Sequence, residues 1–265
     1  MAPKLGRIIG VIPARLESER LPRKVLRPIA GHPMIVWVWR RASDARELDE
    51  LLVATDSEEV AACSRSYSIP FEMTSSAHRS GTERLIEVMD RRPAEIYVNI
   101  QGDEPMVTAR HIELLLEPLR ASPGTLVSTL KVPLPPAEAR DPNSVKVVTD
   151  SRGSPLYFSR AAIPHERDGS GRARYFKHLG MYAYRTAALE RFRALPPSPL
   201  EQIEKLEQLR FLENGISIAV AESSEDTIGV DTAEDLRRVE EFFARTAATL
   251  PGERGSRGGA AIPRR

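Results

Sequence analysis

The sequence has one cysteine, Cys63, among its 265 residues. A single cysteine excludes a disulfide framework, so we expect the reducing environment of the cytoplasm. Long apolar runs are also absent. No stretch approaches the roughly 18 residues that a membrane-spanning helix needs, and the N-terminus lacks the apolar core of a signal peptide. We therefore expect no membrane insertion.

An excess of charge of one sign is missing as well, since the formal net charge is +1. Residues 251–265 contain four arginines and one glutamate, which leaves −2 for residues 1–250. A folded part without a basic excess is not expected to bind nucleic acid. The sequence predicts a single domain over residues 1–250, long enough for a large core, followed by a disordered basic tail at 251–265.

A Walker A motif is the third absence, and it excludes P-loop chemistry. Instead, the apolar run Ile8–Ile12 predicts a buried parallel strand that ends at Pro13. The loop after it carries four cations within ten positions: Arg15, Arg20, Arg23 and Lys24. Open α/β sheets bind ligands at the carboxyl ends of their strands, so this loop is predicted to hold a polyphosphate. The alternative is an ordinary solvated basic loop.

Strand and helix patterns alternate along the chain, which predicts a doubly wound α/β fold. Strands are expected near 8–12, 51–54, 96–100, 125–132, 177–184 and 216–221, with a hairpin over 144–150 and 154–160. Helices are expected near 33–45, 58–66, 80–89, 110–120, 199–214 and 232–245. Residues 161–175 are irregular and are predicted to form a mobile flap.

Ser80 begins one of these helices and, with Glu83, fits a capping box. Gly81 would also let a ligand approach the backbone, and the free N–H groups of the helix start favour anionic groups. Arg84 follows one turn later and could point the same way. Capping alone explains Ser80 and Glu83, so a nucleotide contact is the second of two interpretations.

Two aspartates stand out as candidate Mg²⁺ ligands. Asp103 follows the strand predicted at 96–100, which is a frequent Mg²⁺ position in enzymes that handle nucleoside triphosphates. A turn aspartate is the alternative. Near the C-terminus, Thr232 and Asp235 form a capping box that leaves Asp231 free.

The helix predicted at 199–214 carries Glu201, Glu204 and Gln208 on one face. Glu201 also closes a capping box with Ser198. Several charges on a helix surface usually mean solvation, so site roles for these residues are the less favoured interpretation.

Several strings together resemble the 3-deoxy-manno-octulosonate (Kdo) cytidylyltransferase family, the CMP-Kdo synthetases. They run in order from Ile8 to Glu240 and begin with Ile12-Pro-Ala-Arg15. The others are Arg20-Leu-Pro-x-Lys24, Ser80-Gly-Thr-Glu-Arg84, Asn99-Ile-Gln101-Gly-Asp103-Glu-Pro105, Tyr157-Phe-Ser-Arg160-Ala, His178-Leu-Gly-x-Tyr182, Pro199-Leu-Glu201, Leu206-Glu-Gln208-Leu-Arg210 and Gly229-Val-Asp231-Thr232. The resemblance implies a Rossmann-like nucleotide-diphospho-sugar transferase fold, with a mixed central sheet and a β-rich dimerisation subdomain inserted at roughly 131–185. It also implies a homodimer that converts CTP and Kdo into CMP-Kdo and pyrophosphate with Mg²⁺, for lipopolysaccharide biosynthesis.

The resemblance also implies site roles. Arg15, Arg20 and Lys24 match triphosphate-binding positions, and Asp103 and Asp231 match the Mg²⁺ ligands; Lys24, Arg15, Asp103 and Asp231 are the expected catalytic residues. Ser80 and Arg84 match nucleotide contacts, and Gln101 lies between nucleotide and sugar. The positions around the sugar acid are matched by Arg160, His178, Tyr182, Glu201 and Gln208.

The sequence departs from the family pattern at three positions. Arg23 stands where a glycine is usual, Val25 where a proline is usual, and His32 where a lysine is usual. The segment 161–175 is also shorter than in many relatives. Two alternatives stay open at this point: activation of 8-amino-Kdo or another 2-keto sugar acid, and a catalytically inactive nucleotide-binding module.

Overall fold

A nine-stranded mixed sheet forms the middle layer of the structure, a computed structural model that describes residues 5–18 and 20–246. The order along the sheet is β11-β7-β10-β6-β1-β4-β5, and β8 and β9 join at one end through β10. The strands are β1 (Ile8–Ala14), β4 (Glu50–Thr55), β5 (Phe71–Met73), β6 (Ile96–Asn99), β7 (Val127–Leu134), β8 (Lys146–Thr149), β9 (Pro155–Ser159), β10 (Tyr175–Arg185) and β11 (Ile218–Glu222). The predicted tail at 251–265 lies outside the described residues.

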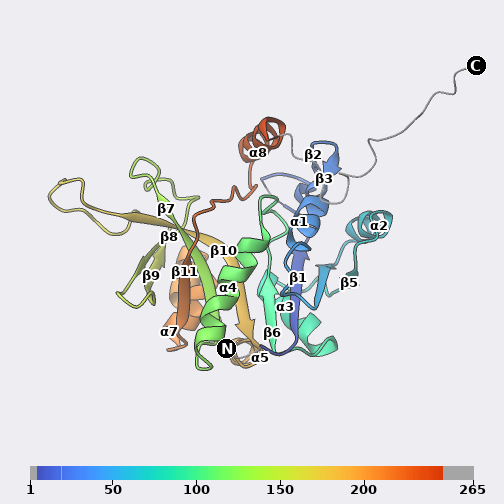
Figure 1. Ribbon diagram of the computed structural model, residues 1–265, viewed down its shortest axis with the longest axis horizontal. Coiled ribbons are helices and arrows are strands. Elements are labelled where there is room, and N and C mark those ends of the chain that lie inside the picture. Colours follow the sequence, from blue (N-terminus) through green and yellow to red (C-terminus); the bar gives the residue numbers. More distant parts are fainter. Residues whose placement is uncertain (1–4, 19, 247–265) are drawn as a thin grey trace, which may run out of the picture.

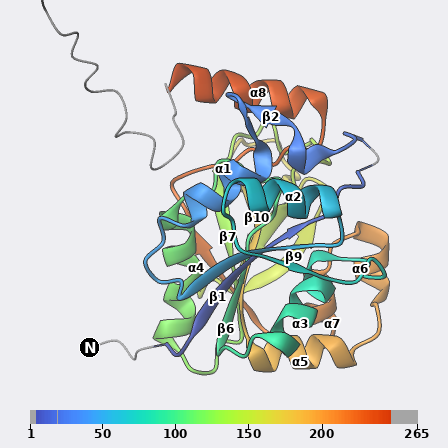
Figure 2. The ribbon, with the colours of Figure 1, turned by 90° about the vertical axis from the view of Figure 1, so that its right-hand side faces the viewer.

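Helices cover both faces of the sheet (Figures 1 and 2). One face carries α1 (Met34–Ala42), α2 (Glu58–Ser66), α4 (Ala109–Ala121) and α8 (Ala233–Arg245). The other carries α3 (Gly81–Arg91), α5 (Thr186–Ala194) and α7 (Gln208–Glu213), with the short α6 (Pro199–Glu204) beside α7. Strand β1 shows the pattern behind this: Ile8 and Ile12 pack into the first core, and Ile9 and Val11 into the second. Side chains of a strand alternate between faces, so an all-apolar run is buried on both.

The order in which successive strands are added to the sheet reverses at β1. The strands β1, β4 and β5 run parallel on one side, and β6 pairs with β1 in parallel on the other. The crevice beyond the carboxyl ends of β1 and β6 is therefore the switch point at which doubly wound sheets bind ligands. A 3₁₀ turn, η1 (Lys24–Leu26), and the small ribbon β2 (Pro28–Ile29) and β3 (His32–Pro33) follow the loop after β1. The predicted fold class is confirmed.

Figure 1 shows β10 running from the centre of the sheet out to the β8–β9 hairpin. It pairs antiparallel with β6 through Tyr182–Arg185 and antiparallel with β7 through Tyr175–Leu179 and Tyr182–Tyr184. A bulge interrupts the register between Leu179 and Tyr182. Residues 131–185 thus contain the end of β7 and all of β10, which belong to the central sheet, together with the β8–β9 hairpin.

Two local predictions were wrong, and one helix was not predicted. Strand β1 continues through Pro13 to Ala14, because β6 pairs only with Ile8–Val11 and no neighbour on that side needs an N–H from Pro13. The single helix expected at 199–214 is two helices, separated at Lys205, whose backbone is left-handed with φ 56° and ψ 47°. The sequence also gave no prediction for α5, although its buried Ala188, Leu189 and Phe192 mark one helical face.

Candidate active site

A cavity of about 980 Å³ opens beyond the carboxyl ends of β1 and β6. The loop after β1, the start of α3 and the residues after β6 line it, together with two single residues from later in the chain. Predicted site residues in the lining are Arg15, Arg20, Lys24, Ser80, Arg84, Gln101, Asp103 and Asp231. The structure therefore brings the predicted triphosphate, nucleotide and metal residues to one place. Arg160, His178, Tyr182, Glu201 and Gln208 are not in this lining.

Lys24 lies between the two predicted metal ligands. Its Nζ is 2.6 Å from Asp103 Oδ2 and 2.9 Å from Asp231 Oδ1. Burial opposes the charge of the ammonium, but the two carboxylates outweigh it and raise the pKa of Lys24 above its ordinary value. Arg20 adds a second cation, 2.8 Å from Asp231 Oδ2. Burial likewise opposes the charge of Asp231, yet Lys24 and Arg20 hold its pKa below the ordinary value.

The backbone explains why these distant residues meet. The N–H of Val230 donates to the carbonyl of Asp103 (2.9 Å), which joins the segment before α8 to the end of β6. The capping box of α8 is confirmed and is made by Thr232 and Asp235, so it leaves the carboxylate of Asp231 for the cavity. Gly102 permits the close approach, because a Cβ there would lie 2.8 Å from the carbonyl oxygen of Pro13.

The two carboxylates fit a divalent cation that is shared with phosphate. They already converge on one positive charge, the ammonium of Lys24. No cluster of three or more His, Cys, Asp or Glu side chains suited to a metal occurs among residues 5–18 and 20–246. Magnesium is commonly held by one or two carboxylates with water and substrate phosphates as the remaining ligands, so a pair of aspartates is sufficient.

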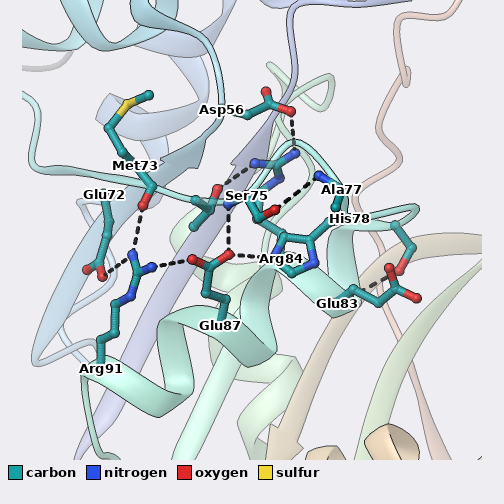
Figure 3. A network of polar contacts seen from close by, with 12 residues as sticks. Asp56, Glu72, Met73, Ser75, Ala77, His78, Glu83, Arg84, Glu87 and Arg91 are labelled. Atoms are coloured by element: carbon teal, nitrogen blue, oxygen red, sulfur yellow. Dashed lines mark hydrogen bonds and ion pairs between the residues drawn. The ribbon is translucent and has the colours of Figure 1, made fainter.

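A hydrogen-bonded network fixes the wall at the start of α3 (Figure 3). Arg84 is buried; its guanidinium donates to Asp56 (2.9 Å) and to Thr74. Glu87 accepts from the N–H of Ser75 (2.8 Å) and contacts His78 and Arg91. These contacts pin residues 74–79, so Arg84 holds the wall rather than reaching freely into the cavity.

Ser80 and Gln101 also line the cavity. Ser80 caps α3 by accepting from the N–H of Glu83 (3.2 Å), whereas the Glu83 carboxylate accepts from Arg79, not from Ser80. The Nε2 of Gln101 donates to the carbonyl of Gly180 (3.1 Å), inside the β10 bulge. Gln101 therefore links the cavity to β10, where its expected position between nucleotide and sugar would require it.

Three of the predicted sugar residues lie on β10 or directly after β9. His178 is buried, with Nε2 2.8 Å from Thr129 Oγ1, and burial lowers its pKa to about 3. Tyr182 is buried beside it, with ring centroids 5.5 Å apart, and burial raises its pKa. Arg160 donates from Nε to the carbonyl of Glu204 (2.9 Å) and from Nη1 to that of Pro142 (3.0 Å).

Glu201 and Gln208 have different surroundings. Glu201 completes the capping box of α6 with Ser198 and forms a double ion pair with Arg210, in which both side chains are nearly buried. The side chain of Gln208 is buried, and its Nε2 has no hydrogen-bond partner in the described structure. A buried amide without a partner is costly unless a ligand or water completes it.

Sequence reasoning missed two residues near the cavity. Glu207 accepts from Thr82 Oγ1 (2.7 Å), and burial raises its pKa. Glu207 lies inside the family string Leu206-Glu-Gln208-Leu-Arg210, whereas the prediction assigned the carboxylate role to Glu201. Lys205 lines the cavity from the break between α6 and α7. Nothing local in the sequence indicated that the helix breaks there.

Comparison with known proteins gives consistent results. Residues 9–218 match the model of the cytidylyltransferase family. The chain is 56% identical over 236 residues to the 3-deoxy-manno-octulosonate cytidylyltransferase of Acidobacterium capsulatum, covering 89% of this chain and 96% of the relative. It is 51% identical to that of Koribacter versatilis, covering 89% of each.

A solved structure agrees with these sequence relatives. It is a CMP:2-keto-3-deoxy-manno-octonic acid synthetase complexed with CTP, with a TM-score of 0.86 and 44% identity. The match covers 91% of this chain and 99% of that one. None of the helices in the described part of this chain is long and apolar enough to span a membrane.

Proposed function

Because the chain belongs to the cytidylyltransferase family, alongside the 3-deoxy-manno-octulosonate cytidylyltransferases, we propose that it converts CTP and Kdo into CMP-Kdo and pyrophosphate. A hydroxyl oxygen of the sugar acid attacks the α-phosphorus of CTP. A new P–O bond forms, the bond from the α-phosphorus to the oxygen that bridges it to the β-phosphorus breaks, and pyrophosphate leaves with that electron pair, while the hydroxyl proton is released to solvent. The product is the activated sugar that lipopolysaccharide biosynthesis consumes.

The observation that carries this proposal is the convergence of Lys24, Asp103 and Asp231 in a cavity lined by further cations. Phosphoryl and nucleotidyl transfer need positioning and charge neutralisation more than covalent catalysis. Arg15 lines the cavity and has no ion-pair partner within residues 5–18 and 20–246, so its guanidinium is available to the triphosphate. Together with Arg20 and Lys24 it would stabilise the leaving pyrophosphate.

We propose that Asp103 and Asp231 hold Mg²⁺ beside the α-phosphate. When bound there, the cation would neutralise phosphate charge and lower the pKa of the attacking hydroxyl. Lys24 then has to move from between the carboxylates toward the phosphates, since one position cannot hold both cations. Its flexible four-carbon side chain permits this.

The sugar acid is proposed to bind between Gln101, β10 and the α6–α7 pair. Arg160 would contact its carboxylate through Nη2, since Nε and Nη1 are engaged by carbonyls. His178, Tyr182 and Gln208 would contact the sugar, and the unpartnered Nε2 of Gln208 supports this. For a carboxylate contact to the sugar we favour Glu207 over Glu201, because the Glu201 carboxylate already accepts from Arg210 and from the N–H of Ser198.

We further propose a homodimer that works in the cytoplasm. Leu156 on β9 and Ile203 on α6 are large apolar side chains with 66% and 77% of their surface exposed, and β9 is hydrogen-bonded only to β8 among the described strands. Exposed apolar side chains and a free strand edge are features that subunit contacts cover. The proposed substrate CTP and the single cysteine are consistent with a cytoplasmic enzyme.

The test is pyrophosphate release with Mg²⁺ across CTP, UTP, ATP and GTP and across a panel of sugar acids. We expect release with CTP and Kdo, and little with the other nucleotides. Preference for 8-amino-Kdo or another 2-keto acid would replace the sugar assignment and keep the chemistry. Tight CTP binding with no release in any combination would instead indicate an inactive nucleotide-binding module.

A further inference from the structure

Lys205 holds an unusual backbone conformation for a residue with a side chain. It ends α6 with φ 56° and ψ 47°, and its N–H donates to the carbonyl of Glu201. The left-handed region costs a residue with a Cβ about 1 kcal/mol, and glycine or asparagine is the usual occupant. A lysine at this position is therefore not explained by the helix end alone.

Lys205 lines the same cavity as the loop after β1. Four other cations of the lining are paired with carboxylates: Lys24 with Asp103 and Asp231, Arg20 with Asp231, Arg23 with Glu59, and Arg84 with Asp56. Within residues 5–18 and 20–246, Lys205 has no ion pair. A cation that faces a cavity without a counter-ion is available to an anionic ligand.

The neighbours of Lys205 place it beside Arg160, one of the proposed sugar-binding residues. The preceding carbonyl, of Glu204, accepts from Arg160 Nε (2.9 Å). The Glu204 carboxylate accepts from the N–H of Arg160 (2.9 Å) and from Ser159 Oγ (2.6 Å). Lys205 thus follows directly on the residue that anchors Arg160, the proposed carboxylate ligand.

We propose that Lys205 is a further substrate-binding residue whose ammonium pairs with the carboxylate of the acceptor sugar acid, beside Arg160. The triphosphate already has Arg15, Arg20 and Lys24, which come from the loop after β1. Lys205 comes from a different part of the chain, the break between α6 and α7. Its charge selects an acidic sugar over a neutral one of the same shape. The inference rests on the proposed function.

The experiment compares Lys205→Gln, Lys205→Arg and wild type in pyrophosphate release, with the KM values for Kdo and CTP measured separately. Loss of one charge-assisted contact predicts a KM for Kdo about tenfold higher in Lys205→Gln, with the KM for CTP within about twofold. Lys205→Arg keeps the charge and is expected within about threefold of wild type. The control is Arg110→Gln, which removes one charge on α4, outside the cavity.

A second measurement separates a ligand role from a role in the fold. Wild type should favour Kdo over its neutral methyl ester, and Lys205→Gln should narrow that preference. Lys205→Gly relieves the left-handed strain, so it should be at least as thermally stable as wild type while showing the same rise in the KM for Kdo.

Three results would overturn the assignment: an unchanged KM for Kdo, an equal rise in the KM for CTP, or a change confined to the melting temperature. A wild-type enzyme that releases no pyrophosphate from CTP and Kdo would instead refute the proposed function itself.

Discussion

The cavity and the proposed sugar site beside it hold their polar groups in different ways. In the cavity, which is the proposed nucleotide end, Lys24, Asp103 and Asp231 come from distant parts of the chain and keep 13%, 30% and 44% of their side-chain surface exposed. At the proposed sugar end, outside the cavity lining, His178, Tyr182 and Gln208 are buried, and Glu201 and Arg210 are paired almost out of contact with solvent. The first end is a set of opposed charges in an open cavity, and the second is part of the core.

Because of this difference, substitutions in the two regions should affect different properties, namely turnover and the free energy of unfolding. Charges that oppose one another in an open cavity can be exchanged for ligand charges, so substitutions there should change turnover and leave the fold intact. Polar groups that are buried and paired lose a partner when one member is replaced, and that is costly in free energy of unfolding. Substitutions at the sugar end should therefore divide into those that affect stability and those that affect substrate binding.

Asp103→Asn should give the largest effect. It keeps the shape of the side chain but removes half of the charge that faces the proposed cation. We expect turnover to fall by about 10²–10³-fold, with a melting temperature close to that of wild type. Steady-state kinetics and thermal unfolding measure the two quantities. Asp226→Asn, which loses a carboxylate paired with Lys177 outside the cavity, should keep its activity; comparable losses in both variants would contradict the metal role.

The nucleotide end was largely predictable from the sequence, because its signals are local. A strand followed at once by cations, and another followed by Gly102 and Asp103, place those side chains at the same edge of a sheet. The capping box of Thr232 and Asp235 likewise left Asp231 free, as the structure shows. What the sequence could not show is that Lys24 lies between the aspartates, since this depends on packing between segments more than 200 positions apart.

The sugar end was less predictable because its residues depend on breaks in regular structure. One uninterrupted helix over 199–214 would put Glu201 and Gln208 on a common face. The left-handed backbone at Lys205 ends the helix before Gln208, so the two residues no longer share a helix face. Lys205 lines the cavity, and Glu201 pairs with Arg210. The bulge between Leu179 and Tyr182 is equally invisible in the strand pattern. Glycine, the usual mark of a left-handed residue, is absent at position 205.

Glu201→Gln and Glu207→Gln form a matched pair that tests this difference. Glu201→Gln breaks a nearly buried ion pair with Arg210, so we expect a loss of about 2–3 kcal/mol in the free energy of unfolding, with KM and kcat unchanged. Glu207→Gln removes a charge that burial already disfavours, so its stability should stay within about 1 kcal/mol while the KM for Kdo rises. Chemical denaturation measures the free energy of unfolding of both variants, and steady-state kinetics measures their KM for Kdo. A raised KM in Glu201→Gln and a stability loss in Glu207→Gln would indicate that Glu201 is the sugar-binding carboxylate.

The pH dependence of stability tests the burial of His178. Its pKa is about 3 in the folded protein and about 6.5 when unfolded. Between those values the unfolded state binds the extra proton, so stability falls as the pH is lowered from 6.5 toward 3. This one group should cost about 2 kcal/mol between pH 7 and pH 5. His178→Asn should be less stable at pH 7 but should lose about 2 kcal/mol less on acidification; equal pH slopes by urea denaturation would contradict the burial argument.

Arg23 should give the smallest effect, although it belongs to the loop after β1 that is proposed to bind phosphate. Its backbone is left-handed, with φ 58°, which gives a physical reason for a glycine at this position. Its guanidinium pairs with Glu59 on α2, but the two side chains are 62% and 51% exposed, so the pair contributes at most about 1 kcal/mol. In Arg23→Gly, relief of the backbone strain should offset this loss, so the free energy of unfolding should change by less than about 1 kcal/mol.

The same variant tests whether the loop contains a fourth phosphate ligand. Arg23 is engaged by Glu59, so Arg23→Gly should raise the KM for CTP by no more than about twofold. Glu59→Gln frees the guanidinium and should leave that KM unchanged or lower it. If Arg23→Gly instead raised the KM for CTP tenfold, a strained residue at the nucleotide end would be a ligand in its own right. Left-handed strain would then mark ligand contacts at both ends of the cavity, at Arg23 as at Lys205.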